Sequence, residues 1–186
     1  MATERSTREG ILLSLMEEFR GCGFDGVSLS RISEVTGLGK ASLYHHFPGG
    51  KGEMAEAVMD LAGTWLGEHV FAPMEAAGDP AARLAAVLKA LEGFYEGGAK
   101  SCLLDVMPLG GSPAVRGAVK AVLQHLQGGF ERLAQDAGLP RAEARSRAEG
   151  ALVALQGSLV VARGLGDTAP FARAVKALRR DFLRPA

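Results

Sequence analysis

Apolar residues recur at helical spacing through almost the whole chain, and this pattern is the strongest limit on what the chain can fold into. Over residues 54–70 the apolar positions are separated by steps of four, three and one, as on one face of a helix. No segment shows the apolar-polar alternation of a half-buried strand. The pattern predicts an all-α protein with about nine helices, two of them very short, over residues 11–19, 28–35, 38–47, 50–71, 80–95, 101–109, 112–133, 141–161 and 168–182.

The character of these helices changes near residue 50. Before this point they are short and interrupted by glycines, and after it they are long and rich in Leu, Val and Ala. A length of 186 residues fits one domain, or a small domain joined to a larger one. The sequence therefore predicts a small N-terminal module, residues 1–50, and a larger helical body, residues 51–186.

Charge and cysteine usage exclude several classes of protein. Lys and Arg number 21, as do Asp and Glu, so a polybasic nucleic-acid coat or membrane binder is excluded, whereas a local DNA-binding face is not. Cys22 and Cys102 lie far apart and outside any CxxC pair, so no disulfide framework or zinc site is expected. The longest apolar stretch, residues 151–161, is shorter than the roughly 20 residues that span a bilayer. We expect a cytoplasmic protein without a membrane segment.

Residues 28–47, SLSRISEVTGLGKASLYHHF, carry the most specific motif. Two short helical segments flank a glycine-containing turn at residues 36–38, the arrangement of a helix-turn-helix. Ser28 is a suitable N-cap for the first segment. The apolar residues would fix the angle between the two helices, and the second helix would present polar side chains able to donate to phosphates and to reach base edges in a major groove. The expected small core consists of Ile32, Val35, Leu38 and Leu43.

With this motif, residues 8–60 resemble the N-terminal domain of the tetracycline-repressor (TetR/AcrR) family. The matching residues are the apolar stripe ending in Phe19, then Gly23, Phe24, Ser28, Leu29, Ile32, Val35, Gly37, Lys40, Leu43, Tyr44, His45, His46, Phe47 and Lys51. The resemblance implies an all-helical homodimer, with a three-helix DNA-binding domain and a C-terminal body for ligand binding and dimerisation. The segments 47–51 and 157–167 are similar to a branch that often regulates efflux or xenobiotic-response genes.

Carried over position by position, the resemblance implies DNA contacts through Ser28, Lys40, Ala41, Ser42, Tyr44, His45 and Lys51. Gly39 departs from the family, which usually has Ser or Thr there, so one phosphate contact of the family is not expected. As a cap, Gly is weaker than Ser by only about a few tenths of a kcal/mol. Residues 28–51 hold three basic residues and one acidic residue, a net charge of +2, so few phosphate contacts and a shallow salt dependence are expected.

Other chemistry has no support in the sequence. His45 and His46 are adjacent and so point to different sides of a helix, and no Cys, Asp or Glu stands at ligand spacing beside them. The Gly-Lys pairs at residues 39–40 and 50–51 lack the upstream Gly and the following Ser or Thr of a phosphate-binding loop. We therefore expect no metal, no cofactor and no catalytic residues.

The helical body contains a set of candidate pocket residues. For each residue alone, core packing is the plainer interpretation. Together they combine apolar and aromatic surroundings with a few polar groups, as in a small-molecule cavity between helices. The body shows no evident buried charge, so an apolar, neutral or aromatic effector is expected. The candidates are Trp65, Phe94, Tyr95, Cys102, Met107, His125, Phe130 and Gln156.

Residues 141–163 and 167–184 end the chain, and small residues within them suit close contact between helices. By resemblance they would form a four-helix dimer interface. The combined prediction is a ligand-responsive transcriptional repressor that binds a palindromic operator as a dimer and is released by its effector. The alternative is a helical carrier or sequestering protein for small molecules with a vestigial helix-turn-helix. The sequence identifies neither the effector nor the operator and target genes, and it leaves repression versus activation and the number of dimers per operator open.

Overall fold

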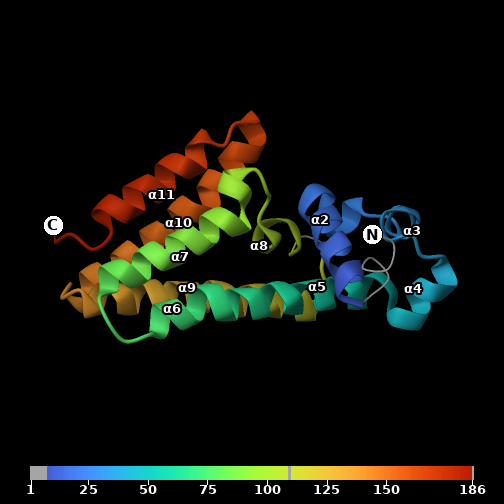
Figure 1. Ribbon diagram of the computed structural model, residues 1–186, viewed down its shortest axis with the longest axis horizontal. Coiled ribbons are helices and arrows are strands. Elements are labelled where there is room, and N and C mark those ends of the chain that lie inside the picture. The colour runs from blue at the N-terminus through green and yellow to red at the C-terminus, as the bar shows by residue number, and fades with distance from the viewer. Residues whose placement is uncertain (1–7, 109, 186) are drawn as a thin grey trace. The chain divides into compact units, whose positions relative to one another are not determined.

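The computed structural model describes residues 8–108 and 110–185, and every regular element in these ranges is helical (Figure 1). The all-α prediction is therefore confirmed. In chain order the elements are α2 (Arg8–Gly26), α3 (Leu29–Thr36), α4 (Lys40–His46), α5 (Gly50–Leu66), the π-helical turn η1 (Gly67–Phe71), α6 (Ala72–Glu75), α7 (Pro80–Phe94), the 3-10 turn η2 (Glu96–Gly98), α8 (Leu103–Val106), α9 (Pro113–Asp136), α10 (Arg141–Leu165) and α11 (Ala169–Asp181).

Two helix starts follow from capping residues that are readable in the sequence. The Ser28 hydroxyl accepts the Arg31 N–H at 3.1 Å, which caps α3. The two carboxylate oxygens of Asp79 accept the N–H groups of Ala81 and Ala82 at 3.1 and 3.2 Å, which caps α7. Side-chain oxygens at these positions satisfy amide groups that have no partner within the helix. The predicted cap at Ser28 is confirmed.

The first helix continues further than its glycines suggest. The sequence predicted a helix over residues 11–19, but Gly21 is helical and α2 resumes after a kink at Gly23. Gly23 has φ of 68°, and a Cβ there would lie 3.1 Å from the Val106 carbonyl oxygen. Glycine therefore serves two purposes here, because it allows a left-handed backbone and lets α8 pack closely against α2.

The helix expected over residues 50–71 is divided by a wider turn. After α5, the Ala72 N–H bonds to the Gly67 carbonyl, five residues back, which defines the π-helical turn η1. Pro73 follows directly. In a regular α-helix its ring would meet the carbonyl of His69, four residues earlier, and it has no N–H to offer. The wider turn accommodates this proline within a continuous helical path.

The chain forms two compact units. The first consists of Met1–Gly63 and Leu103–Lys120, and the second of Thr64–Cys102 and Ala121–Ala186. The segment Leu103–Lys120, which contains α8, therefore belongs with the N-terminal helices, although about 40 residues of the chain separate it from them. The helices α5 and α9 each continue from one unit into the other. The functional division into residues 1–50 and 51–186 stays a prediction.

In the second unit, α10 packs along α11, and α11 also contacts α7 (Figure 1). The inner face of α10 is buried at intervals of three or four residues, as expected for a helix with one face in a core. The buried positions are Ala144, Ala148, Ala151, Leu155, Leu159 and Ala162. Because most of them are alanine, the neighbouring helices can approach α10 closely.

Candidate nucleic-acid interface

The turn between α3 and α4 is held by side-chain hydrogen bonds. Gly37 ends α3 with φ of 69°, a left-handed conformation that favours glycine. The Ser33 hydroxyl donates to the Leu38 carbonyl at 2.5 Å. The buried Thr36 hydroxyl donates to the Ile32 carbonyl at 2.7 Å. These bonds satisfy carbonyls at the end of α3 and in the turn, so the turn has one defined geometry.

Beneath the turn lies a small apolar core. Ile32 and Leu43 are buried, whereas Val35 and Leu38 are half-buried. Phe47, at the end of α4, is also fully buried. Of the four predicted core residues, two are therefore fully enclosed and two lie partly at the surface, and Phe47 is a further buried residue. This core fixes α4 against α3 and leaves the opposite side of α4 in solvent.

The outer face of α4 carries the residues expected to touch DNA. Lys40, Ala41, Tyr44 and His45 are exposed, and Ser42 is half-buried. With Ser28, also exposed, they lie on the α3–turn–α4 segment of one compact unit. The face combines a cation, hydroxyl groups and an imidazole, all of which can hydrogen-bond phosphates or base edges. These DNA contacts themselves stay predictions.

Tyr44 is both exposed and packed. Its side chain is 46% exposed, and its ring carbon Cε1 would lie 3.5 Å from a Cβ at Gly50. Gly50 has φ of 67° and begins α5. The Tyr44 ring therefore lies against the start of α5, while the residue as a whole remains exposed. This geometry allows Tyr44 both to pack against α5 and to contact a phosphate.

Lys51 has protein partners. Its ammonium donates to the carbonyls of Phe24 at 3.0 Å and Val27 at 3.1 Å, and lies 4.4 Å from the centre of the Phe24 ring. Lys51 thus ties the end of α2 to the start of α5. Two of the three N–H groups of the ammonium are engaged in this contact, which leaves one for the phosphate contact that stays predicted.

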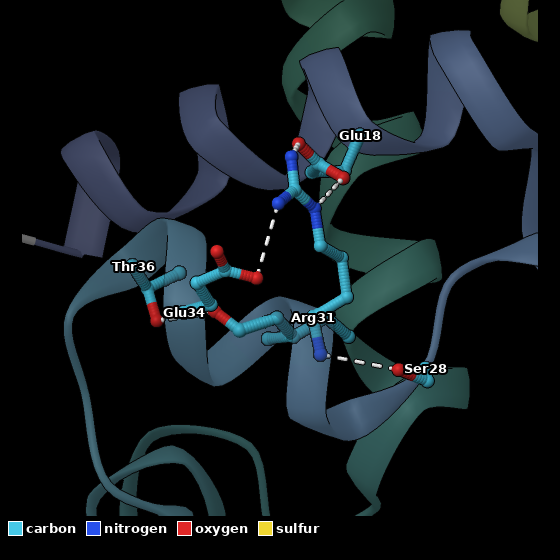
Figure 2. Close-up of polar contacts among 6 residues, drawn as sticks. Glu18, Ser28, Arg31, Glu34 and Thr36 are labelled. Atoms are coloured by element: carbon cyan, nitrogen blue, oxygen red, sulfur yellow. Dashed lines mark hydrogen bonds and ion pairs between the residues drawn. The ribbon is translucent and has the colours of Figure 1, made fainter.

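Arg31 connects α3 with α2 through a pair that sequence reasoning missed. Its guanidinium donates to both carboxylate oxygens of Glu18, and also to Glu34 one turn along α3 (Figure 2). The hydrogen bonds to Glu18, then that to Glu34, raise the pKa of Arg31 above its already high value. Glu18 precedes Arg31 by 13 residues. No local spacing rule relates residues so far apart, so no signal in the sequence pointed to this pair.

In the second unit, four of the predicted ligand residues come together. The Trp65 and Phe94 rings stack with centroids 4.4 Å apart, and the Tyr95 ring meets Phe94 edge-on at 5.2 Å. The Tyr95 hydroxyl and the Cys102 thiol share a hydrogen bond of 3.2 Å. His69, absent from the predicted set, also stacks on Trp65, with ring centroids 4.5 Å apart. Together these rings form a continuous aromatic stack.

The other four predicted ligand residues lie elsewhere. Met107 is buried within the first unit, and Gln156 is half-buried on α10. The Phe130 ring packs edge-on against Phe182 at 5.4 Å. His125 stacks on Phe71 at 3.9 Å. The role of all eight residues in ligand binding stays a prediction.

Two cavities in the second unit are lined by other residues. A cavity of about 630 Å³ lies at the end of α6 and includes Glu75, Arg83 and Arg132. His125 Nε2 donates to Glu75 at 2.9 Å, and this bond lowers the pKa of Glu75, with the charge of Arg132 acting in the same direction. A groove of about 250 Å³ lies between α10 and α11. None of the eight predicted ligand residues lines either cavity.

Within residues 8–108 and 110–185, no three His, Cys, Asp or Glu side chains gather as a metal site would require. Over the same ranges, no helix has both the length and the apolar character needed to cross a membrane.

Comparison with known proteins gives matches at two levels. The family model described as bacterial regulatory proteins, tetR family, matches residues 11–58. The transcriptional regulator LmrA of Bacillus subtilis (strain 168) is 34% identical over 106 residues, 56% of this chain and 54% of that protein. YxaF of the same organism, an uncharacterised HTH-type regulator, is 31% identical over 80 residues, 43% of this chain and 42% of its own. The chain thus spans about half the length of the curated relatives it matches.

Solved structures match over almost the full length. A TetR transcriptional regulator from Legionella pneumophila has a TM-score of 0.78 at 17% identity, covering 96% of this chain and 98% of its own. A cysteine mutant of the TetR family regulator CifR, complexed with 26bp double-strand operator DNA, has a TM-score of 0.74 at 20% identity. The match covers 94% of this chain and 96% of the CifR chain. At such low identity these matches establish the fold alone, including that of the C-terminal helices.

Proposed function

Because the chain belongs to the tetR family of bacterial regulatory proteins, a family of regulators and not of enzymes, we propose that it is a ligand-responsive repressor. In this proposal a dimer binds a palindromic operator, and a small, mostly apolar effector releases it. The observation that carries the proposal is the solvent-facing side of α4, where Lys40, Tyr44 and His45 are exposed above a rigid turn.

The proposed DNA contacts divide into two kinds. Lys40, at the first turn of α4, and Ser28, at the cap of α3, are suited to phosphates. Ser42 and His45 would reach base edges if α4 lies in the major groove, and the Tyr44 hydroxyl would contact a phosphate. The small Ala41 allows the backbone of α4 to approach the DNA closely.

A dimer through α10 and α11 is supported by an apolar surface on α10. Val153 and Leu165 are 71% and 70% exposed, and Val160 and Val161 are 42% and 48% exposed. Exposed apolar surface is typical of surfaces that associate, and we propose that these side chains along α10 contribute to one. The adjacent groove between α10 and α11 is lined mainly by small residues that permit close helix approach: Gly150, Ala151, Ala154, Ala174 and Ala177. A two-fold dimer would space two α4 helices by one helical turn of DNA, roughly 34 Å, or a multiple of it.

Replacing Val153 by Asp is expected to turn the dimer into a monomer. In a two-fold interface each substitution introduces two carboxylates, which lose water on association. We expect the dimer dissociation constant to rise by at least about tenfold, equivalent to about 1.4 kcal/mol. Light scattering during gel filtration over a range of concentrations measures this change. Leu13→Asp is the matched control, because Leu13 is 51% exposed but lies on α2. Equal dissociation constants for the two variants would contradict the proposed interface.

The proposed effector site is the aromatic stack around Trp65 and Phe94. The helix α5 begins at Gly50, beside the Tyr44 ring, and continues to Leu66, next to Trp65. A ligand that displaces these rings would shift this helix and so alter the placement of α4. An effector releases the operator only when it binds the released form more tightly. An aromatic, uncharged effector fits the stack, and regulation of efflux or xenobiotic-response genes stays a prediction.

Selection from random duplex DNA at near-physiological salt tests the proposal directly. We expect sequencing after a few rounds to show enrichment of one palindrome. This palindrome then serves as the probe for effectors, whose saturation should lower operator affinity. If folded, dimeric protein enriches no sequence, the repressor proposal is wrong. If an effector saturates the protein and operator affinity stays unchanged, the induction part alone is wrong.

A further inference from the structure

The Arg31–Glu18 pair differs from an ordinary surface ion pair. Arg31 Nε and Nη2 donate to the two Glu18 oxygens at 2.9 and 3.0 Å, a bidentate geometry (Figure 2). The Glu18 side chain is only 16% exposed and the Arg31 side chain 49%. Isolated surface pairs contribute little to stability, whereas bidentate pairs within a network fix relative geometry.

The Arg31–Glu18 pair lies next to apolar residues whose burial does not fix the orientation of α3 on α2. Glu18 precedes Phe19, and Arg31 precedes Ile32; both of these apolar side chains are fully buried, and α2 packs against α3. Apolar burial is not directional, so it allows small rotations and slides of one helix on another. A planar guanidinium with two parallel hydrogen bonds to a carboxylate does not allow such rotations and slides. The ion pair therefore supplies the orientation that the apolar contact lacks.

The Arg31 guanidinium is already hydrogen-bonded to carboxylates of the protein, whereas a cation that contacts DNA needs free N–H groups. A phosphate would have to displace both Glu18, on α2, and Glu34, whose oxygen accepts from Nη1 at 3.1 Å. In Figure 2 the guanidinium points from α3 toward α2. Among the three basic residues of the segment 28–51, Arg31 and Lys51 are thus both engaged by the protein.

We propose that Arg31 is a positioning residue for operator recognition, which rests on the DNA-binding function proposed above. Its clamp on Glu18 orients α3 on α2, and the rigid turn after α3 transfers this orientation to α4. The clamp contributes to specificity for the operator and makes no contact with DNA. The Glu34 bond stays within α3 and therefore has no part in orienting the helices.

Two isosteric variants separate this role from a simple change of charge. Glu18→Gln and Glu34→Gln each remove one negative charge next to the same guanidinium, but only the first removes the bidentate contact between α3 and α2, because a Gln amide has a single acceptor oxygen. The readout is the ratio of affinities for the palindrome enriched by the wild-type protein and for a scrambled duplex of equal composition. Because charge affects both duplexes alike, the ratio reports geometry.

Glu18→Gln is expected to lower the affinity ratio about threefold to tenfold, and Glu34→Gln to leave it unchanged. Arg31→Lys keeps the charge but cannot form the bidentate contact, so it should lower the ratio as Glu18→Gln does. The double variant Glu18→Gln with Arg31→Lys should be no worse than either single variant. Circular dichroism checks that every variant is folded.

Two results would overturn the proposal while leaving DNA binding intact. The first is an equal ratio for Glu18→Gln and Glu34→Gln. The second is tighter operator binding by Glu18→Gln than by Glu34→Gln, with a salt dependence steeper by about 0.9 for each half-site, which would show that Arg31, once released from Glu18, contacts a phosphate. If the wild-type protein selects no operator at all, the proposed function fails first, and this inference fails with it.

Discussion

Replacing Lys40 and Tyr44 together by Ala is expected to reduce operator affinity about 100-fold or more. Each residue would lose a contact in both halves of the dimer, and good contacts to bases or phosphates contribute about 1–3 kcal/mol each. Both side chains are exposed on α4, so the fold should survive. Titration of the selected palindrome measures the loss. Because Lys40 is a proposed phosphate contact, the salt dependence should also become shallower by about 0.9 for each half-site.

The same double variant separates a regulator from a small-molecule carrier. A regulator should lose its operator and keep its effector, whereas a carrier should lose nothing. Trp65 is the only tryptophan of the chain, so its fluorescence reports effector binding at the proposed stack without interference. Lys120→Ala is the control, since Lys120 is also exposed but lies on α9. Unchanged operator affinity in the double variant would exclude α4 as the reading helix.

Gly98→Ala is expected to destabilise the protein by about 3 kcal/mol or more. Gly98 has φ of 104°, a conformation that side chains rarely adopt, and a Cβ there would lie 2.7 Å from Cβ of the fully buried Phe171. Backbone strain contributes about 1–3 kcal/mol, and overpacking contributes about as much again. Because the clashing atom is the root of the Phe171 side chain, a rotamer change cannot relieve it, and the start of α11 must move.

Gly97 provides a matched control at the neighbouring position. It also has positive φ, 66°, but a Cβ added at Gly97 would meet no atom within 4 Å. Gly97→Ala should therefore lose only the backbone contribution, about 1–2 kcal/mol. Urea unfolding with unchanged slope measures both values, and the melting temperature of Gly98→Ala should fall by about 6–12 °C. Equal destabilisation by the two substitutions would show that packing against Phe171 is unimportant.

Capping and helical periodicity were readable from the sequence because they act over three or four residues. Ser28 caps α3 as expected, and Ile32 and Leu43 are buried as the apolar spacing predicted. Pro73 also carried a signal, since a proline inside a helical pattern disturbs the turn before it. The periodicity alone did not show that this disturbance takes the form of a π-helical turn.

The candidate ligand set shows where sequence reasoning stopped. All eight residues were chosen for their chemistry, and four of them do come together: Trp65 stacks on Phe94, Tyr95 meets Phe94 edge-on, and Cys102 shares a hydrogen bond with Tyr95. His69 completes that stack, although its exposed position in the helical pattern gave no reason to include it. Residue type does not reveal which neighbours a side chain will meet, because those neighbours come from other helices.

The helices, the cap at Ser28, the glycine turn and the polar face of α4 could be predicted from the residue order, since each depends on residues within about one helical turn of one another. The contact of Arg31 with Glu18, the contact of Lys51 with the end of α2, and the place of Leu103–Lys120 in the first unit could be recognised only in the folded chain. These contacts link residues 13 or more positions apart. They form because buried helix faces bring distant segments together, and no local spacing in the chain encodes that arrangement.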